Sequence, residues 1–240
     1  MDVQIFENAE QIGVKVGSQL ASAIRQKPNI VLGLATGASP IPTYDYLSNL
    51  CSVRELSFKD VVTFNLDEYC NLPREDKNSY YSFMNEHLFS KIDINPDNVH
   101  FLNGNTDDDE KECERYNQML IDAGLVDIQL LGIGTNGHIG FNEPAERYTK
   151  GAFKIALTES TRKSNSVYFD ENPMPTHALT MGIGNIMSAK QIIMIAVGEK
   201  KRNAVKAMIE GEVTPKCPAS ILQFHPNVTV YLDKQAAALL

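Results

Sequence analysis

A chain of 240 residues with 43% hydrophobic and 22% charged residues has the composition of an ordinary globular protein, which excludes general disorder. No apolar run approaches the roughly 20 residues that span a bilayer. The first ten residues, MDVQIFENAE, lack the basic start and apolar middle of a secretory signal, so we expect a cytoplasmic protein with no membrane partner. The formal net charge of -8 argues against nucleic acid as a partner, because phosphate backbones bind basic surfaces.

The four cysteines, Cys51, Cys70, Cys113 and Cys217, are scattered along the chain. They form no CxxC pair and no Cys/His cluster of the spacing that marks a zinc site. We therefore expect reduced thiols, mostly buried, and no metal site.

Hydrophobic periodicity predicts strands and helices that alternate along the chain. Short apolar runs predict strands at residues 2–6, 30–34, 61–66, 99–102, 153–157, 191–197 and 228–232. Apolar stripes predict helices between residues 12 and 27, from Thr43 onward, over 79–89, from a cap at Thr106 to about Ala123, over 200–209 and from Lys234 onward. This alternation favours a doubly wound, mostly parallel sheet with helices on both faces, a Rossmann-like three-layer α/β fold. With no internal repeat or linker, residues 1–240 are expected to form a single domain.

The first predicted strand-to-helix loop holds Thr36, Gly37, Ala38 and Ser39. Its backbone N–H groups and two hydroxyls at the start of a helix are suited to binding a phosphate. Neither GxxxxGK[ST] nor GxGxxG is present, so a phosphorylated metabolite fits better than ATP or NAD. The alternative is a glycine turn that only reverses the chain.

Two adjacent carboxylates, Asp67 and Glu68, follow the strand predicted at 61–66. Such a pair at a strand end is typical of a general base, of a metal ligand, or of charges on a solvated loop. The residues alone do not separate these three interpretations.

Residues 127–144, DIQLLGIGTNGHIGFNEP, combine an apolar run, a glycine-rich bend and two groups that move protons. The pattern predicts a buried parallel strand that opens into a tight loop at its carboxyl end, where open α/β sheets hold their ligands. Glu143 follows His138 by five residues, near enough in a curled loop to orient the imidazole for acid/base work. The alternative is a structural histidine in a turn.

Lys200, Lys201 and Arg202 follow the strand predicted at 191–197. At least one of these cations is placed to lie over the carboxyl edge of the sheet, although a solvated helix start is an equally good interpretation.

Together these segments strongly resemble the glucosamine-6-phosphate deaminase (isomerase) family over nearly the whole chain. The motifs are LGLATGASP at 32–40, FNLDEY at 64–69, NSYYSFM at 78–84, GIGTNGHIGFNEP at 132–144 and PASILQFHP near the end. LDEY and NGHIGFNEP are specific, whereas 6-phosphogluconolactonases share the TGASP loop in looser form. The resemblance implies conversion of glucosamine 6-phosphate and water to fructose 6-phosphate and ammonia, with no metal or organic cofactor.

The resemblance also implies roles for particular residues. Asp67 matches the base that moves a proton between C2 and C1 of the opened sugar, which is reasonable chemistry for a carboxylate beside an aldehyde. His138 matches the acid/base that opens the ring, and Glu143 the carboxylate that supports it. Asn136 stands where some members have Asp, and an amide orients by hydrogen bonding without carrying charge. The implied phosphate ligands are Thr36, Gly37, Ala38, Ser39 and Lys201.

The sequence departs from the family at Val167, where members usually have an arginine before two aromatic residues. Losing a charge-assisted bond to phosphate costs about 1.5 to 3 kcal/mol. Either a neighbour such as Arg162 compensates, or substrate binding is weaker or altered. The chain also lacks the C-terminal extension of regulated hexameric members, so we expect no activation by N-acetylglucosamine 6-phosphate.

Three other functions remain open at this point. Galactosamine-6-phosphate deaminase is kept open by Val167, and 6-phosphogluconolactonase shares the fold without needing the LDEY carboxylate. A sugar-phosphate sensor in a transcription regulator predicts a helix-turn-helix and a basic face, and neither is evident. The sequence does not decide between a monomer and a homo-oligomer.

Overall fold

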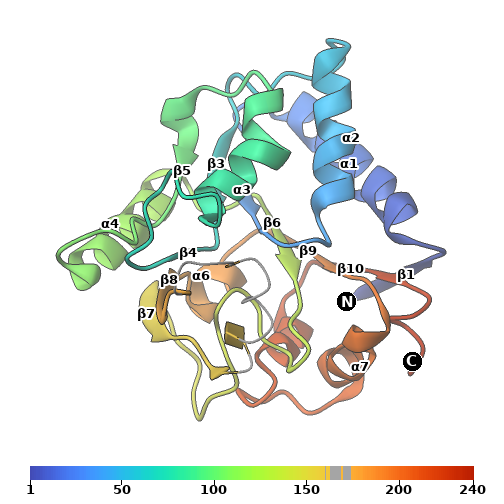
Figure 1. The fold of residues 1–240 in the computed structure, drawn as a ribbon. Helices are drawn as coiled ribbons and strands as arrows, with labels where there is room; N and C mark the ends of the chain where they lie inside the picture. The colour runs from blue at the N-terminus through green and yellow to red at the C-terminus, as the bar shows by residue number, and fades with distance from the viewer. Residues whose placement is uncertain (160, 163–168, 170–173) are drawn as a thin grey trace.

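A computed structural model describes the whole chain except residues 160, 163–168 and 170–173. Its centre is a seven-stranded sheet in which neighbouring strands run parallel (Figure 1). The order across it is β1 (Asp2–Phe6), β10 (Val228–Asp233), β9 (Gln191–Ala196), β6 (Ile128–Gly132), β2 (Val31–Leu34), β3 (Val62–Asn65) and β5 (Val99–His100). The predicted mostly parallel sheet is confirmed. The strand predicted at 228–232 is β10, which lies one place in from the edge of the sheet, with β1 outside it.

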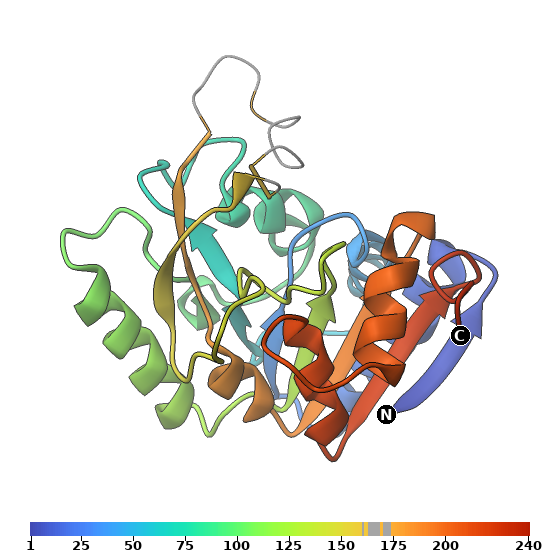
Figure 2. The same cartoon turned by 90° about the horizontal axis from the view of Figure 1, so that it is seen from below.

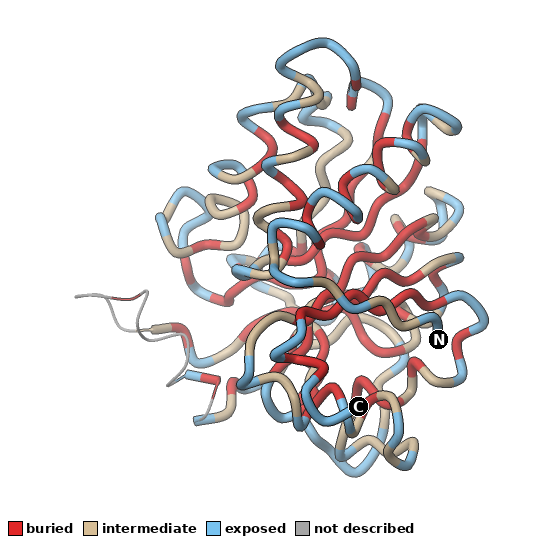
Figure 3. The backbone as a smooth tube through the Cα atoms, turned by 90° about the vertical axis from the view of Figure 1, so that its right-hand side faces the viewer, coloured by how far each residue is buried: buried red, intermediate tan, exposed pale blue. Residues whose placement is uncertain are grey.

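Helices cover both faces of this sheet, as predicted. One face carries α1 (Ala9–Gln26), α2 (Ile41–Ser52) and α3 (Tyr80–His87), and the other carries α4 (Asp109–Asp122), α6 (Ile183–Met187) and α7 (Arg202–Glu210). Because successive strand residues point to opposite faces, Ile193 joins the first group of helices and Met194 the second. Figure 3 shows the buried strands between the two more exposed helical layers.

A second, three-stranded antiparallel sheet lies beside the first and was not predicted. It consists of β4 (Asp67–Tyr69), β8 (His177–Thr180) and β7 (Phe153–Ala156), the last two drawn in orange and yellow in Figure 2. Leu66 joins the two sheets, because its N–H donates to Leu34 O while its carbonyl accepts from Met181 N. The segment after β3 therefore continues as a strand, and Asp67 is held in a ladder with Thr180.

One predicted helix boundary and one predicted helix were wrong. Asp108, not Thr106, caps α4, since its Oδ1 accepts from Lys111 N at 3.1 Å. Residues from Lys234 onward form turns instead of a helix. Asp233 holds the first turn by accepting from Gly198 N and Ala236 N, at 3.0 and 2.7 Å.

The remaining predicted helices are present with small shifts. Ser79 caps α3 through a bond from Ser82 N, and the 3-10 helix η1 (Phe89–Lys91) follows it. The segment from residue 199 begins as the 3-10 helix η4 (Glu199–Lys201) and continues as α7. Within the described residues, no helix combines the length and apolar character that crossing a membrane requires.

Candidate active site

The direction in which the chain crosses the main sheet changes between β2 and β6. These two strands are neighbours, but β2 leads on to β3 and β5 on one side, whereas β6 leads on to β9 and β10 on the other. In open α/β sheets the carboxyl ends of the strands at such a switch point form the ligand crevice. The loop at 35–40 follows β2, and the loop at 133–143 follows β6. The predicted phosphate loop and the predicted acid/base loop therefore start from adjacent strands.

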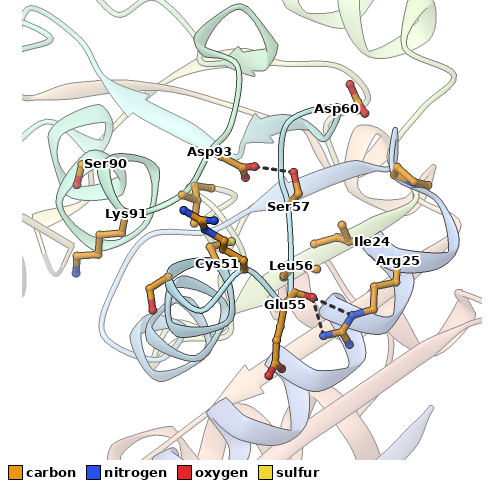
Figure 4. A pocket seen from close by; sticks show the side chains of 14 residues that line it. Ile24, Arg25, Cys51, Glu55, Leu56, Ser57, Asp60, Ser90, Lys91 and Asp93 are labelled. Atoms are coloured by element: carbon orange, nitrogen blue, oxygen red, sulfur yellow. Dashed lines mark hydrogen bonds between the residues drawn. The ribbon is translucent and has the colours of Figure 1, made fainter.

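A cavity of about 890 Å³ lies at the opposite edge of the sheet (Figure 4). Its lining comes from residues 24–28, 51–60 and 90–93, which precede β2, β3 and β5. Polar groups of this cavity already bond to its own lining: Arg25 donates to Glu55 O, and Asp93 accepts from Ser57 Oγ and Phe58 N. We therefore place the site at the carboxyl edge.

The loop after β6 folds tightly around His138. Gly134 N donates to His138 O at 2.9 Å, and Gly137 adopts a positive φ of 85°. A Cβ at Gly134 would stand 2.2 Å from the imidazole, so only glycine leaves room for the ring. A quarter of the His138 side chain remains exposed.

Glu143 lies beside the imidazole as a clamped carboxylate. His138 Nδ1 is 3.6 Å from Glu143 Oε1, while Asn136 Nδ2 donates to Oε2 at 2.7 Å. Thr161 Oγ1 donates to Oε1, and Thr158 Oγ1 lies 3.4 Å from it. Burial by itself raises the pKa of Glu143. The combined effect of His138, Thr161 and Asn136 is larger and opposite, and the pKa falls to about 2. This carboxylate is a fixed anion at every physiological pH.

Asp67 lies on β4 beside the same loop. Its Oδ2 is 3.5 Å from the position of a Cβ on Gly140, two residues after His138. The side chain is 6% exposed, and no hydrogen bond from the described residues reaches its carboxylate. Burial, with a smaller contribution from Glu68, holds the pKa of Asp67 well above its ordinary value. A buried carboxylate without donors retains a proton readily and is suited to accept one from a carbon acid.

The neighbouring Glu68 serves the fold. Its carboxylate accepts from Tyr69 N, Tyr80 N and Tyr81 N, at 2.8, 2.9 and 2.9 Å. Two of these donors belong to the first turn of α3, whose N–H groups have no partner within the helix. Of the two adjacent carboxylates, Asp67 is the one that accepts no hydrogen bond from the described residues, whereas Glu68 accepts three. Among the described residues, no group of three or more His, Cys, Asp or Glu side chains is placed to hold a metal ion.

The loop from Thr36 to Ser39 is open at the surface. Gly37 and Ala38 are exposed, and Gly37 adopts a positive φ of 97°. α2 begins directly after Pro40 without a side-chain cap. Below the loop, the buried Tyr44 donates its hydroxyl to Ala35 O at 2.6 Å. These features leave the uncapped start of a twelve-residue helix next to an exposed loop at the carboxyl edge of the sheet.

Lys201 is the basic residue that reaches the loop after β6. Its Nζ donates to Ile133 O at 2.6 Å, and burial lowers its pKa. Lys200 is exposed, and Arg202 is paired with Glu199 at 2.6 Å. Among the three adjacent cations, Lys201 is the one that bonds to the loop after β6 within the described chain.

Thr158 and Thr161 are residues of this site that sequence reasoning missed. They follow β7 and reach Glu143 from 15 and 18 positions along the chain, and no pattern in the sequence indicates this. Val167 lies outside the described residues. Arg162 is exposed next to Thr161, with its N–H donating to Thr158 O at 2.9 Å.

Comparison with known proteins gives consistent matches over the whole chain. The family model of glucosamine-6-phosphate isomerases/6-phosphogluconolactonase matches residues 6–231. Glucosamine-6-phosphate deaminase of Clostridium botulinum (strain Alaska E43 / Type E3) is 45% identical over 241 residues, covering 100% of this chain and 97% of that protein. Glucosamine-6-phosphate deaminase 1 of Giardia intestinalis is 47% identical over 229 residues, covering 95% and 86%.

Solved structures agree with these matches. The structure of a monomeric glucosamine-6-phosphate deaminase superposes with a TM-score of 0.97 at 43% identity, covering 100% of both chains. A 6-phosphogluconolactonase from Trypanosoma brucei shares the fold, with a TM-score of 0.77 at 20% identity and coverage of 100% and 98%. The chain therefore belongs to the glucosamine-6-phosphate isomerase/6-phosphogluconolactonase family.

Proposed function

We propose that this protein is a glucosamine-6-phosphate deaminase, which converts glucosamine 6-phosphate and water to fructose 6-phosphate and ammonia. Its relatives at 43 to 47% identity carry this name, whereas the lactonase structure is 20% identical. The observation that carries the proposal is Asp67, a buried carboxylate of raised pKa without donors beside the His138 loop. Lactone hydrolysis has no need of such a base, whereas isomerisation of an aldose does.

The first step is opening of the sugar ring, which we assign to His138. The imidazole takes the proton of the C1 hydroxyl and returns a proton to the ring oxygen, so the C1–O5 bond breaks and an aldehyde forms. Glu143 and Asn136 support this step: the anion fixes the ring electrostatically, and Asn136 accepts from His138 N at 3.2 Å while donating to Glu143.

The second step is proton transfer by Asp67. The carboxylate takes the C2 proton of the opened sugar to give an enol-type intermediate and then delivers it to C1. The nitrogen remains on C2 as an imine, to which water adds, and cleavage of the C–N bond releases ammonia and leaves the ketone of fructose 6-phosphate. Burial of Asp67 raises its basicity toward the carbon acid.

The phosphate end of the substrate is assigned to the open loop and Lys201. Thr36, Gly37, Ala38 and Ser39 offer backbone N–H groups and hydroxyls ahead of α2, and Lys201 adds an ammonium group that its bond to Ile133 O holds beside the loop after β6. We propose that Arg162, one residue from Thr161, supplies the cation that Val167 lacks. Replacing Arg162 by Ala is then expected to raise KM about tenfold or more.

Parallel ammonia assays with glucosamine 6-phosphate and galactosamine 6-phosphate test the assignment. We expect ammonia from glucosamine 6-phosphate, with fructose 6-phosphate formed in equal amount. Release from galactosamine 6-phosphate alone would transfer the function to that substrate. A protein that releases ammonia from neither but hydrolyses 6-phosphogluconolactone would contradict the proposal and favour the lactonase.

We also propose a cytoplasmic protein that works as a single domain. All four cysteines are free thiols, as is usual in a reducing compartment. The first and last strands, β1 and β10, pair with each other in the main sheet, and the family model covers residues 6–231, which supports one unit.

A further inference from the structure

His138 Nδ1 has an unusual position next to a carboxylate. This nitrogen is buried and has no hydrogen-bond partner within the described structure. The distance from His138 Nδ1 to Glu143 Oε1 is 3.6 Å, which is longer than a hydrogen bond. A hydrogen bond between an imidazole nitrogen and a carboxylate oxygen normally has a length of about 2.7 to 3.2 Å. In the substrate-free protein the carboxylate oxygen and the imidazole nitrogen are therefore close neighbours that stop just short of a hydrogen bond.

That oxygen is already occupied by hydroxyls from the segment after β7. Thr161 Oγ1 donates to Glu143 Oε1, and Thr158 Oγ1 donates to Thr161 Oγ1 at 3.0 Å. Thr158 also caps this turn, since its Oγ1 accepts from Thr161 N at 3.3 Å and its carbonyl accepts from Arg162 N at 2.9 Å. On the other side, Asn136 holds Oε2 at 2.7 Å. Both oxygens of Glu143 are thus anchored by donors that do not titrate.

We propose that Thr161 is a positioning residue that holds Glu143 Oε1 and so keeps the carboxylate from hydrogen bonding to His138 in the substrate-free protein. If the hydroxyl is removed, Oε1 loses a donor in a buried setting. The nearest replacement is the unpartnered His138 Nδ1, which donates in the tautomer that carries its proton there, and satisfying a buried acceptor drives the two groups together. Closing 3.6 Å to a normal bond moves the ring by somewhat less than about 1 Å.

Such a shift matters for the reaction, and this step rests on the proposed function. The imidazole must stand at a fixed distance from the sugar oxygens, and a misplacement of about 1 Å costs on the order of 10²-fold in rate. Thr161 therefore links the segment after β7 to the ring-opening histidine. Its hydroxyl sets the resting position of that ring without touching the substrate.

The test compares Thr161→Val, which keeps the shape and removes the hydroxyl, with Thr161→Ser, which keeps the hydroxyl. Thr176→Val is the matched control: it removes a threonine hydroxyl from an exposed position opposite Leu157, where the hydroxyl contacts His177 and not Glu143. Circular dichroism verifies folding, and Thr161→Ala replaces Thr161→Val if the valine variant does not fold.

The first readout is the proton NMR spectrum of the imidazole N–H groups without substrate. We expect a low-field N–H signal, diagnostic of an imidazole–carboxylate bond, in Thr161→Val and not in the wild type, Thr161→Ser or Thr176→Val. A signal already present in the wild type, or none in Thr161→Val, would overturn the proposal. Because no substrate is used, this result stands apart from the proposed function.

The second readout is ammonia release from glucosamine 6-phosphate. We expect kcat of Thr161→Val to fall about tenfold with KM within about twofold, and Thr161→Ser to restore it. Equal losses in the valine and serine variants would show a packing role and contradict positioning by the hydroxyl. A wild type that releases no ammonia would refute the proposed function and leave the spectroscopic result to decide the role of Thr161.

Discussion

Two regions at the carboxyl edge, β4 and the loop after β6, each bury a carboxylate but give it opposite hydrogen-bonding environments. On β4, Asp67 is buried with no donor from the described residues, and burial raises its pKa. In the loop after β6, Glu143 is equally buried but accepts from Asn136 and Thr161, and its pKa is lowered to about 2. Environment, not residue type, thus separates a group that exchanges a proton from a group that keeps its charge.

A similar contrast exists within β4 itself. Asp67 and Glu68 are adjacent and both buried, yet the Glu68 carboxylate accepts hydrogen bonds from three backbone N–H groups around the start of α3. Alternation along a strand sends the two side chains to opposite sides. The strand therefore places one carboxylate at the crevice and uses the next one to fix the helix behind it.

Apart from loss of the base Asp67 itself, the largest expected effect comes from breaking the fixed anion. Glu143→Gln places an amide NH₂ against one of the two donors, Asn136 or Thr161, and it removes the charge next to His138. We expect kcat for ammonia release to fall about 10²-fold or more. Glu146→Gln, at a neighbouring exposed glutamate paired with Lys216, is the control and should change nothing. Activity of Glu143→Gln within threefold of wild type would contradict the assigned role.

The second prediction concerns Glu68. Glu68→Gln sets an amide donor against one of the three backbone N–H groups, so we expect the free energy of unfolding to fall by about 1 to 3 kcal/mol. The melting temperature then drops by about 2 to 4 °C for each kcal/mol. Thermal unfolding of Glu68→Gln and of the exposed Glu75→Gln measures this. Equal melting temperatures would show that the capping bonds contribute nothing.

The pH dependence of kcat/KM sharpens the same contrast. The base must be ionised, so the acid limb reports Asp67, whose pKa lies above the ordinary value of about 3.9. Glu143, with a pKa of about 2, adds no limb in the working range. Since Glu68 contributes to the raised pKa of Asp67, Glu68→Gln should move the limb to lower pH. A limb that stays in place would remove Asp67 as its origin.

The smallest effect is on stability at Asp67. Its folded pKa is raised, so its contribution to stability is complete below the unfolded pKa of about 3.9 and is lost as pH rises through the folded pKa. Asp67→Asn should therefore raise the melting temperature by a few degrees at neutral pH and by nothing in acid. For Glu143 the sign is reversed, with stability present above about 4.3 and lost toward pH 2. Differential scanning calorimetry across pH distinguishes the two cases.

Local sequence patterns predicted the main sheet well because buried parallel strands are apolar blocks and α1 repeats Ile12, Val16, Leu20 and Ile24 on one face. The second sheet escaped prediction because β4 has three residues, DEY, and β8 four, HALT, too few to show a period. Threonine contacts such as Thr161 to Glu143 depend on how the segment after β7 returns to the crevice, which is a property of tertiary structure. The distinction between Asp67 and Glu68 likewise needed coordinates, since it rests on which carboxylate finds the N–H groups of α3.

Separating binding from turnover in Asp67→Asn tests the central claim most directly. The side chain keeps its size, and the phosphate ligands lie elsewhere, in the loop after β2 and in η4, so calorimetry should show glucosamine 6-phosphate bound with a Kd near the wild-type value. Ammonia release should fall by about 10² to 10⁴-fold because the proton on C2 then has no base to accept it. An Asp67→Asn variant that releases ammonia at the wild-type rate would contradict the account.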